Sequence, residues 1–261
     1  MFRNFYIVSL LVAIASVQMH GQYYDISFKK DVGPLALGVG MLTLGTILER
    51  NADPAVLEEI NMLRVEDLNF LDRGATNNNS STAQNISDIV LFSSVAYPFI
   101  TFASSKCRAN TGAIVVMTAE VGMLTLGVTN IFKGGVDRYR PFNYNPETDL
   151  EMKLGDDSRK SFISGHTSMV TALTFLTARI ITDLHPDTKN KGVIWGAAIT
   201  APAILGYMRV RAGRHFPTDV IAGYAVGATI GYLIPEFHLV KNENVKISNA
   251  GVSGVKLSLN F

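Results

Sequence analysis

The 261-residue sequence contains a single cysteine, Cys107, and almost no excess of charge. One cysteine excludes an internal disulfide and any cysteine-rich metal cluster, and its apolar neighbours favour an inert thiol. The net charge of +1 at pH 7 gives no argument for a nucleic-acid partner, because nucleic-acid-binding domains usually carry a strongly basic face. Partners therefore have to be inferred from individual sites.

Long uninterrupted apolar runs are also scarce, although the chain is hydrophobic overall. Hydrophobic residues make up 48% of the sequence and charged residues 17%, with a mean hydropathy of +0.21. Most of the apolar segments have about 15 residues, fewer than the roughly 20 that cross a bilayer without tilting. Composition alone therefore leaves open a membrane protein and a soluble helical bundle.

Residues 1–21 have a short basic start, an apolar core at residues 5–17 and a small residue, Gly21, where a cleavage site would lie. This pattern predicts a cleavable secretory signal peptide, with an uncleaved membrane anchor as the alternative. No cysteine follows, so a lipoprotein attachment point is not expected.

Six apolar segments, most of them rich in glycine and alanine, predict helices. They are residues 33–48, 89–103, 113–132, 168–181, 193–207 and 220–233. In the last segment, Gly223, Gly227 and Gly231 recur every four residues and give a smooth face for close packing. The polar stretch 49–83 predicts a long exposed connection. Residues 23–28 predict an extended arm or short strand.

Together these segments predict an all-α fold, a helical bundle of about six core helices. Residues 245–247 and 255–261 flank Asn249, Ala250 and Gly251 and predict a short C-terminal β-hairpin. The predicted organisation is a signal peptide (1–21), an N-terminal arm with the first helix and a polar loop (22–85), a core domain (86–237) and a C-terminal tail (238–261).

Charge concentrates in residues 209–219, between two apolar segments. Pro217 has the φ angle of a first helical turn, so a helix is predicted to start there, with His215 just before it and Asp219 inside its first turn. A carboxylate that accepts from one imidazole nitrogen leaves the other nitrogen basic. Arg209 and two further arginines add permanent positive charge that suits a phosphate. The stretch predicts a phosphate site, and a basic loop between helices is the alternative.

Two other polar islands, residues 133–141 and 161–168, interrupt the apolar helices. Ser164 is a good N-cap residue, so a helix is predicted to start at Gly165 and to direct free N–H groups and its positive dipole end at an anion. His166 would lie at the rim of that site. Taken singly, the islands also fit a helix-ending basic loop and a plain capped helix start.

The three islands together resemble the three signature motifs of the type 2 phosphatidic acid phosphatase (PAP2) superfamily, which also contains vanadium haloperoxidases and bacterial class A acid phosphatases. The first motif, a lysine, six residues and Arg-Pro, is met by Lys133, Arg140 and Pro141. The second, Pro-Ser-Gly-His, is met by Ser164, Gly165 and His166, with Ile163 in place of proline. The third, Ser-Arg, five residues, His, three residues and Asp, is met by Arg209, His215 and Asp219, with Met208 in place of serine.

The resemblance covers about residues 86–235 and implies a metal-independent acid phosphatase that acts through a phosphohistidine. His215 would attack phosphorus, Asp219 would stabilise its imidazolium and His166 would protonate the departing alkoxide. The groups implied to bind the phosphate oxygens are Lys133, Arg140, Ser164, Gly165 and Arg209. Neither a metal nor a cofactor is implied. Four charged residues inside the motifs stand at unmatched positions and are given no role, namely Asp137, Arg138, Arg211 and Arg214.

Substrate class and location are inferred from the apolar segments and from the charges of the loops. A lipid phosphate (phosphatidate, a polyprenyl diphosphate or a lipid A-like molecule) fits a membrane-embedded bundle and is favoured, whereas small phosphoesters fit a soluble periplasmic protein. Basic residues in the loops 104–111 and 187–192 favour a cytoplasmic place for both loops and a periplasmic active site, although six spans after a cleaved signal would put residues 133–140 inside. The rival functions are a vanadate-dependent haloperoxidase and a non-catalytic membrane protein.

Overall fold

A computed structural model gives the fold and describes residues 23–240, apart from the side chains of residues 28–30, together with the backbone of residues 245–249 and 255–259. The predicted signal peptide, residues 1–21, lies outside this part of the chain. Residues 23–240 are mostly helical, which confirms the all-α prediction.

The helices and strands have the following bounds. The α-helices are α2 (Phe28–Arg50), α3 (Leu57–Met62), α4 (Ser81–Ser94), α5 (Tyr97–Ile100), α6 (Ser105–Arg108), α7 (Thr111–Gly135), α8 (Leu150–Lys153), α9 (Gly165–Leu184), α10 (Lys191–Arg211) and α11 (Pro217–His238). The 3-10 helices are η1 (Val65–Asp67), η2 (Arg73–Ala75), η3 (Thr101–Ala103) and η4 (Pro141–Tyr144). Strands β1 (Val245–Asn249) and β2 (Val255–Leu259) pair antiparallel. Residues 250–254, which would form their turn, lie outside the described residues, so the terminal hairpin stays a prediction.

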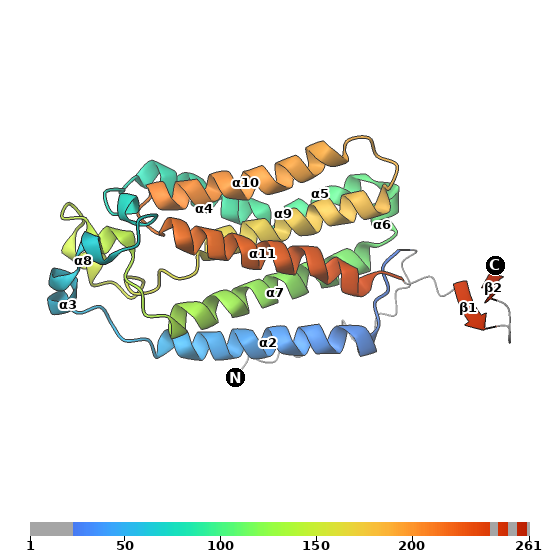
Figure 1. Ribbon diagram of the computed structural model, residues 1–261, viewed down its shortest axis with the longest axis horizontal. Coiled ribbons are helices and arrows are strands. Elements are labelled where there is room, and N and C mark those ends of the chain that lie inside the picture. The colour runs from blue at the N-terminus through green and yellow to red at the C-terminus, as the bar shows by residue number, and fades with distance from the viewer. Residues whose placement is uncertain (1–22, 241–244, 250–254, 260–261) are drawn as a thin grey trace.

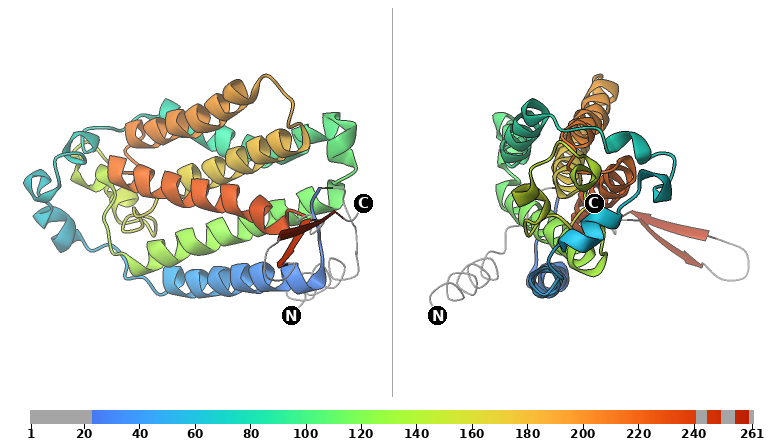
Figure 2. Two further views of the ribbon diagram at one scale, coloured as in Figure 1. Left: turned by 45° about the vertical axis from the view of Figure 1, so that its right-hand side comes forward. Right: turned by 90° about the vertical axis from the view of Figure 1, so that its left-hand side faces the viewer.

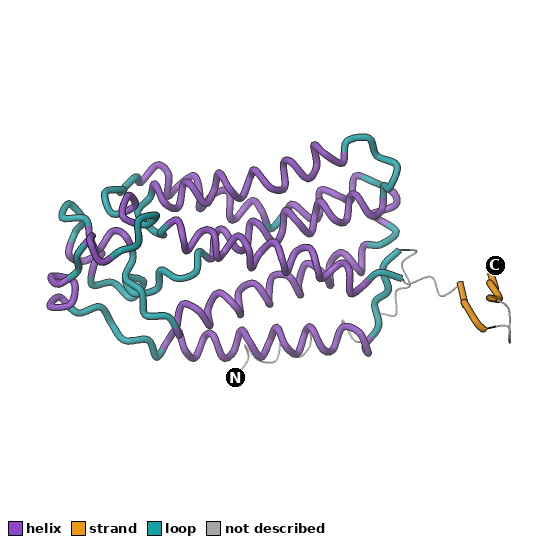
Figure 3. Tube along the Cα trace, viewed as in Figure 1, coloured by secondary structure: helices purple, strands orange, loops and turns teal. Residues whose placement is uncertain are grey.

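Six long segments run along one axis of the molecule, as predicted, and the loops gather at the two ends of the bundle (Figures 1 and 3). They are α2, α4 continued by α5, α7, α9, α10 and α11. Helix α9 contacts α4, α5, α7, α10 and α11, whereas α2 packs mainly on α7 at the edge of the bundle (Figure 2). The central position of α9 puts its N-terminus among the ends of its neighbours.

Helices α2, α7, α9, α10 and α11 are longer than the apolar segments that predicted them, because each continues into polar residues at its ends. Four of them are long and apolar enough to cross a membrane, namely Asp31–Arg50, Thr111–Gly135, Lys191–Arg211 and Pro217–His238. The bent pair of α4 and α5 with η3 makes a fifth if it counts as one span. Several large apolar side chains on these helices are exposed, which suits contact with lipid.

The expectation of one helix over residues 89–103 is wrong, because the chain bends by 50° between α4 and α5. Pro98 lies in the first turn of α5 and has no N–H for the helical ladder. The hydroxyls of Ser93 and Ser94 donate to the carbonyls of Val90 and Leu91 at 2.9 and 2.6 Å. Hydrogen bonds of this kind bend helices.

The glycine face predicted on α11 is confirmed by its packing on α9. A Cβ atom added at Gly223 would lie 2.6 Å from the carbonyl oxygen of Ser164, and one added at Gly227 would overlap the carbonyl oxygen of Ser168. Only residues without a side chain allow the two backbones to approach this closely. The stripe therefore holds the start of α11 against the start of α9.

The connection 49–83 is only partly the exposed loop that was expected. It forms α3, η1 and η2, its last residues begin α4, and Asp72 is fully buried. The Ser80 hydroxyl caps α4 by accepting from the Ala83 N–H at 3.2 Å. Ahead of α2, residues 23–27 form the predicted arm, with one isolated bridge between Tyr24 and Leu239. The connection folds over the end of the bundle where the three motifs meet.

Candidate active site

The three predicted motifs lie at one end of the bundle, the left end in Figure 1. The C-terminal ends of α7 and α10 and the N-terminal ends of α9 and α11 all point there. This follows from the order of the segments, because α9 and α11 run opposite to α7 and α10. Islands that are far apart in sequence are thereby brought to one site.

His215 is buried in the turn between α10 and α11. Its Nδ1 lies 2.8 Å from the carbonyl oxygen of Ser161, which can only accept, so Nδ1 carries the proton and Nε2 is basic. Nε2 lies 3.5 Å from Nη1 of Arg140. Burial, followed by the positive charges of Arg140 and Arg209, lowers the pKa of His215 well below its ordinary value. The imidazole is therefore neutral at physiological pH.

Asp219 does not hold the ring of His215 by the direct hydrogen bond that was expected. Its Oδ2 lies 3.7 Å from Nδ1 of His215 and instead accepts from the Ser161 hydroxyl at 2.6 Å and the Phe216 N–H at 2.9 Å. The N–H of Phe216, the N-cap residue of α11, competes for this carboxylate, as in a capping box. The tautomer of His215 is set by a backbone carbonyl, with the charge of Asp219 close behind it.

Arg138, which lies outside the matched positions of the first motif, forms ion pairs with Asp219 and with Asp72, the latter at 2.6 Å. Asp72 also accepts from the N–H and the hydroxyl of Thr218, at 3.1 and 2.7 Å. The polar connection is thus tied directly to the turn that carries His215. Its partners are far from it in sequence, so no local pattern marks Asp72.

The guanidinium of Arg140 is buried and fixed by three hydrogen bonds. Nε and Nη2 donate to the carbonyl and the carboxylate of Asp157 at 2.8 and 2.7 Å, and Nη1 donates to the carbonyl of Arg214 at 3.0 Å. This arrangement directs Nη1 toward His215. A guanidinium held in this way needs little reordering to bind an anion.

Asp88 joins the second and third motifs, although it belongs to neither. Its Oδ1 lies 2.7 Å from Nε2 of His166 and accepts from Nη1 of Arg209 at 3.1 Å. The Ser87 hydroxyl also accepts from Arg209, at 3.0 Å, whereas Nε of Arg209 is buried without a hydrogen-bond partner among the described residues. Asp88 is the one charged residue of α4, a signal that the sequence offered.

Helix α9 begins at Gly165 as predicted, but Ser164 does not cap it with its side chain. The Ser164 hydroxyl lies 2.9 Å from the hydroxyl of Thr167 instead. A Cβ atom added at Gly165 would lie 3.1 Å from Thr129 and 3.8 Å from Nζ of Lys133, so this glycine lets the backbone approach the lysine. The N–H groups of the first turn have no helical acceptor and remain available.

All eight predicted site residues therefore lie in one region, joined by contacts between motifs. His215 meets Arg140, His166 meets Arg209 through Asp88, and the Ser164 N–H donates to the carbonyl of Asp219 at 3.1 Å. Three cationic side chains, one neutral imidazole and a helix N-terminus suit an oxyanion. Residues 111–243, which contain the whole of this constellation except Asp88 and Asp72, match the family model of the PAP2 superfamily.

The chain belongs to the PAP2 superfamily.

This PAP2 protein is similar to the lipid A 4'-phosphatase of Porphyromonas gingivalis, with 28% identity over 151 residues that make up 56% of the chain and 59% of the relative. It is also similar to the undecaprenyl-diphosphatase of Sulfolobus acidocaldarius, with 36% identity over 114 residues, 41% of the chain and 48% of the relative. The chain spans about half the length of the curated relatives it matches.

Among solved structures, a transmembrane PAP2-type phosphatidylglycerolphosphate phosphatase from Bacillus subtilis matches 91% of this PAP2 chain and 96% of its own. The sequence identity is 18% and the TM-score 0.41.

Proposed function

We propose that this PAP2 protein is a metal-independent phosphatase that hydrolyses a phosphate ester or diphosphate of a lipid at the motif end of the bundle. The observation that carries the proposal is the state of His215. Its ring is neutral, its Nε2 is basic, and that nitrogen lies 3.5 Å from a fixed guanidinium. A nucleophile beside a prepared oxyanion site is what phosphoryl transfer requires.

In the proposed reaction, Nε2 of His215 attacks phosphorus and the bond from phosphorus to the ester oxygen breaks. Lys133, Arg140 and Arg209 bind the equatorial oxygens, where negative charge collects in the transition state. The buried Nε of Arg209 is a donor ready for one of these oxygens. The charge of Asp219, 3.7 Å from Nδ1, stabilises the positively charged phosphohistidine.

His166 acts as the general acid, donating a proton to the departing alkoxide. Water then attacks the phosphohistidine and returns a proton to His166, which releases inorganic phosphate and restores His215. Burial and the charge of Arg209 lower the pKa of His166 to about 4, and the hydrogen bond to Asp88 opposes this shift. Because Asp88 accepts from Nε2, Nδ1 is left for the leaving group.

A lipid substrate is supported by the place of the site at the ends of helices with apolar, exposed sides. Within residues 23–240, four helices are long and apolar enough to cross a bilayer. A phosphate bound at their ends would lie at the level of lipid head groups. The names of the relatives, a lipid A phosphatase and an undecaprenyl-diphosphatase, point to the same substrate class.

We place the motif end on the periplasmic side. Helix α6 with Lys106 and Arg108, and the turn that carries Lys189 and leads into α10 at Lys191, lie at the opposite end (Figure 1). Basic loops favour the cytoplasm. Helix α2 runs from that basic end to the motif end. If α2 crosses the membrane and the motif end is periplasmic, α2 must begin in the cytoplasm. A cleaved signal peptide would instead leave the start of α2 in the periplasm, so the two predictions exclude each other in that case.

Cysteine labelling tests this orientation, because Cys107 is buried and can be replaced by serine. Asp53→Cys at the motif end and Asp187→Cys at the basic end are then exposed single thiols. A membrane-impermeant maleimide added to spheroplasts is expected to label residue 53 and not residue 187. The reverse pattern would place the site in the cytoplasm.

Trapping the covalent intermediate tests the mechanism. The full chain in detergent, with a chelator present, is mixed with ³²P-labelled phosphatidate and quenched in alkali, where phosphohistidine survives. We expect label on the wild type and none on His215→Asn. Phosphate release without any trapped label in the wild type, or equal label on both proteins, would reject the phosphohistidine.

A further inference from the structure

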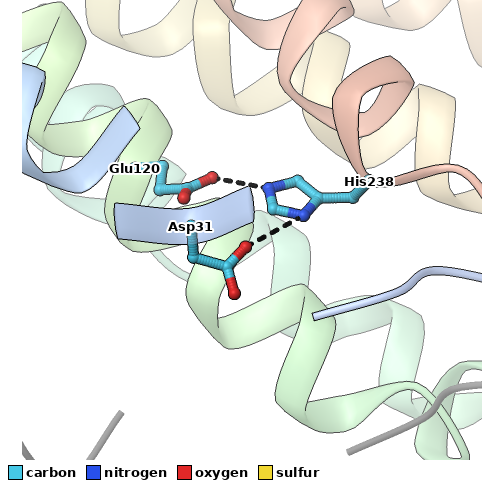
Figure 4. Close-up of side chains that lie close together, drawn as sticks. All are labelled: Asp31, Glu120 and His238. Atoms are coloured by element: carbon cyan, nitrogen blue, oxygen red, sulfur yellow. Dashed lines mark hydrogen bonds and ion pairs between the residues drawn. The ribbon is translucent and has the colours of Figure 1, made fainter. Parts of the chain in front are cut away.

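A second buried polar cluster, which we call the far-end triad, consists of Asp31, Glu120 and His238 (Figure 4). Asp31 lies in the first turn of α2, Glu120 in α7 and His238 at the end of α11. Their exposed fractions are 3%, 0% and 1%. Because α11 rises about 1.5 Å per residue, the nineteen residues from Asp219 to His238 put the triad about 28 Å from the motif end.

The imidazole of His238 lies between the two carboxylates. Its Nε2 is 2.7 Å from Oε2 of Glu120, and its Nδ1 is 3.3 Å from both Oδ1 of Asp31 and the backbone carbonyl oxygen of Asp25. Nδ1 makes its hydrogen bond to the carbonyl oxygen of Asp25. Oδ1 of Asp31 is therefore left without a hydrogen-bond donor.

The far-end triad has too few donors for its acceptors. Besides Oδ1 of Asp31, Oε1 of Glu120 is buried without a hydrogen-bond partner. Among side chains that the structure describes, no lysine or arginine forms an ion pair with either carboxylate. Met117 and Leu124, one turn to either side of Glu120, belong to the hydrophobic core. Two buried carboxylates and one imidazole therefore retain negative charge in an apolar setting, which is costly.

We propose that the far-end triad binds one divalent transition-metal ion of the Zn²⁺ type. Two charges on the ion would neutralise the two carboxylates, and the unpartnered oxygens of Asp31 and Glu120 would become ligands. Carboxylate oxygen with imidazole nitrogen is a donor set that such ions accept. One ligand atom from each residue lies within 4.8 Å of the others. Around one ion, ligands at about 2.1 Å lie no more than about 4.2 Å apart, so only small side-chain shifts are needed.

The hydrogen bond to Asp25 supports this assignment. Metal-binding histidines usually donate from the second ring nitrogen to a carbonyl or carboxylate, which fixes the ring. His238 would bind the ion through Nε2, beside Glu120, while its Nδ1–H keeps the carbonyl of Asp25. The ion would then join α2, α7 and α11 and stabilise the fold, with no part in chemistry about 28 Å away.

Metal titration of the full chain in detergent tests the proposal. The protein is stripped with EDTA, dialysed and titrated with Zn²⁺ alone, with bound metal and thermal unfolding measured. We expect one equivalent bound and a Tm higher by about 5–10 °C when the free ion is at 100 times its Kd. Glu120→Gln and Asp31→Asn should lose both effects. Glu236→Gln, at an exposed position near the same end of α11, is the matched control and should keep them.

The wild type alone decides the question if the triad variants do not fold. Less than about a tenth of an equivalent bound, with no change in Tm, would mean that protons neutralise the triad and would overturn the proposal. Equal binding by the wild type and Glu120→Gln would overturn it as well, because the ion would then lie elsewhere. The phosphatase proposal survives either outcome, since turnover per folded molecule does not depend on this ion.

Discussion

His215 and His238 stand at the two ends of α11, and both are buried, yet their surroundings have opposite charge. His215 faces Arg140 and lies near Arg209, and both charges help to keep its ring neutral. His238 lies between Glu120 and Asp31. The same side chain is thus proposed as a nucleophile at one end and as a metal ligand at the other.

The buried atoms without hydrogen-bond partners also differ between the two ends. At the motif end a donor is left over, Nε of Arg209, whereas in the far-end triad two acceptors are left over, Oδ1 of Asp31 and Oε1 of Glu120. Buried polar atoms without partners are rare in folded proteins. An excess of donors calls for an anion and an excess of acceptors calls for a cation.

The largest effect is expected when the two histidines are exchanged for uncharged side chains. His215→Ala should lower phosphate release from phosphatidate by at least about 10⁴-fold, because the nucleophile is lost. His238→Gln should leave turnover per folded molecule unchanged and lower only the Tm. Both are measured in detergent without added metal. Equal phosphate release by His215→Ala and the wild type would contradict a catalytic role for His215 and with it the proposed difference between the two histidines.

A smaller effect is expected at the proposed general acid. His166→Ala should slow phosphatidate hydrolysis by about 10²–10⁴-fold, and Asp88→Asn, which keeps the shape but removes the charge, by about 10-fold or more. Formation of the phosphoenzyme from p-nitrophenyl phosphate should suffer far less, because p-nitrophenolate leaves without a proton. Burst kinetics with the two substrates make the comparison, and equal losses on both would remove His166 from the acid role.

Substitutions in the glycine stripe of α11, which packs on α9, are expected to lower the stability of the fold. Gly227→Ala should lower the free energy of unfolding by about 1–3 kcal/mol, because the new methyl group overlaps the Ser168 carbonyl. Gly122→Ala in α7 meets open space and should be neutral or stabilising by up to about 1 kcal/mol. Denaturation in detergent measures both, and equal shifts would show that the α9–α11 contact tolerates a side chain.

The smallest effect is expected in the pH profile. Because the pKa of His215 is lowered by burial and by Arg140, kcat/KM should persist below pH 6.5 and fall only as His215 is protonated. Arg140→Gln removes one positive charge, so the pKa rises and the acid limb should move up by about 0.5–1 pH unit. Arg211→Gln, at an exposed position, is the control. Ionisation of the substrate is the same for the wild type and both variants. An acid limb that does not move in Arg140→Gln would therefore contradict the idea that Arg140 lowers the pKa of His215.

Helix starts and close packing were predictable because single residues determine them. Pro217 and Gly165 begin α11 and α9, and the glycines of α11 meet α9 as their spacing indicated. Alternating helices then brought the motifs to one end. The break between α4 and α5 is also marked in the sequence, by Pro98.

Contacts between distant residues could not be predicted in this way. Asp72 and Arg138 are separated by 66 residues, and Glu120 and His238 by 118, so no periodicity joins them. The wrong geometry for Asp219 has a different cause. Spacing placed its carboxylate near His215 correctly, but the Ser161 hydroxyl and the Phe216 N–H compete for the same oxygen.

The buried carboxylate of Asp72 has a consequence for how variation in this chain is interpreted. Residues 51–80 look like a tolerant linker, in which insertions and proteolytic cuts usually leave activity intact. In this chain, Asp72 of that segment accepts hydrogen bonds from Thr218 and forms an ion pair with Arg138. A length change upstream of Asp72 is expected to displace the turn that carries His215, so such a variant should lose the proposed phosphatase activity while the bundle stays folded.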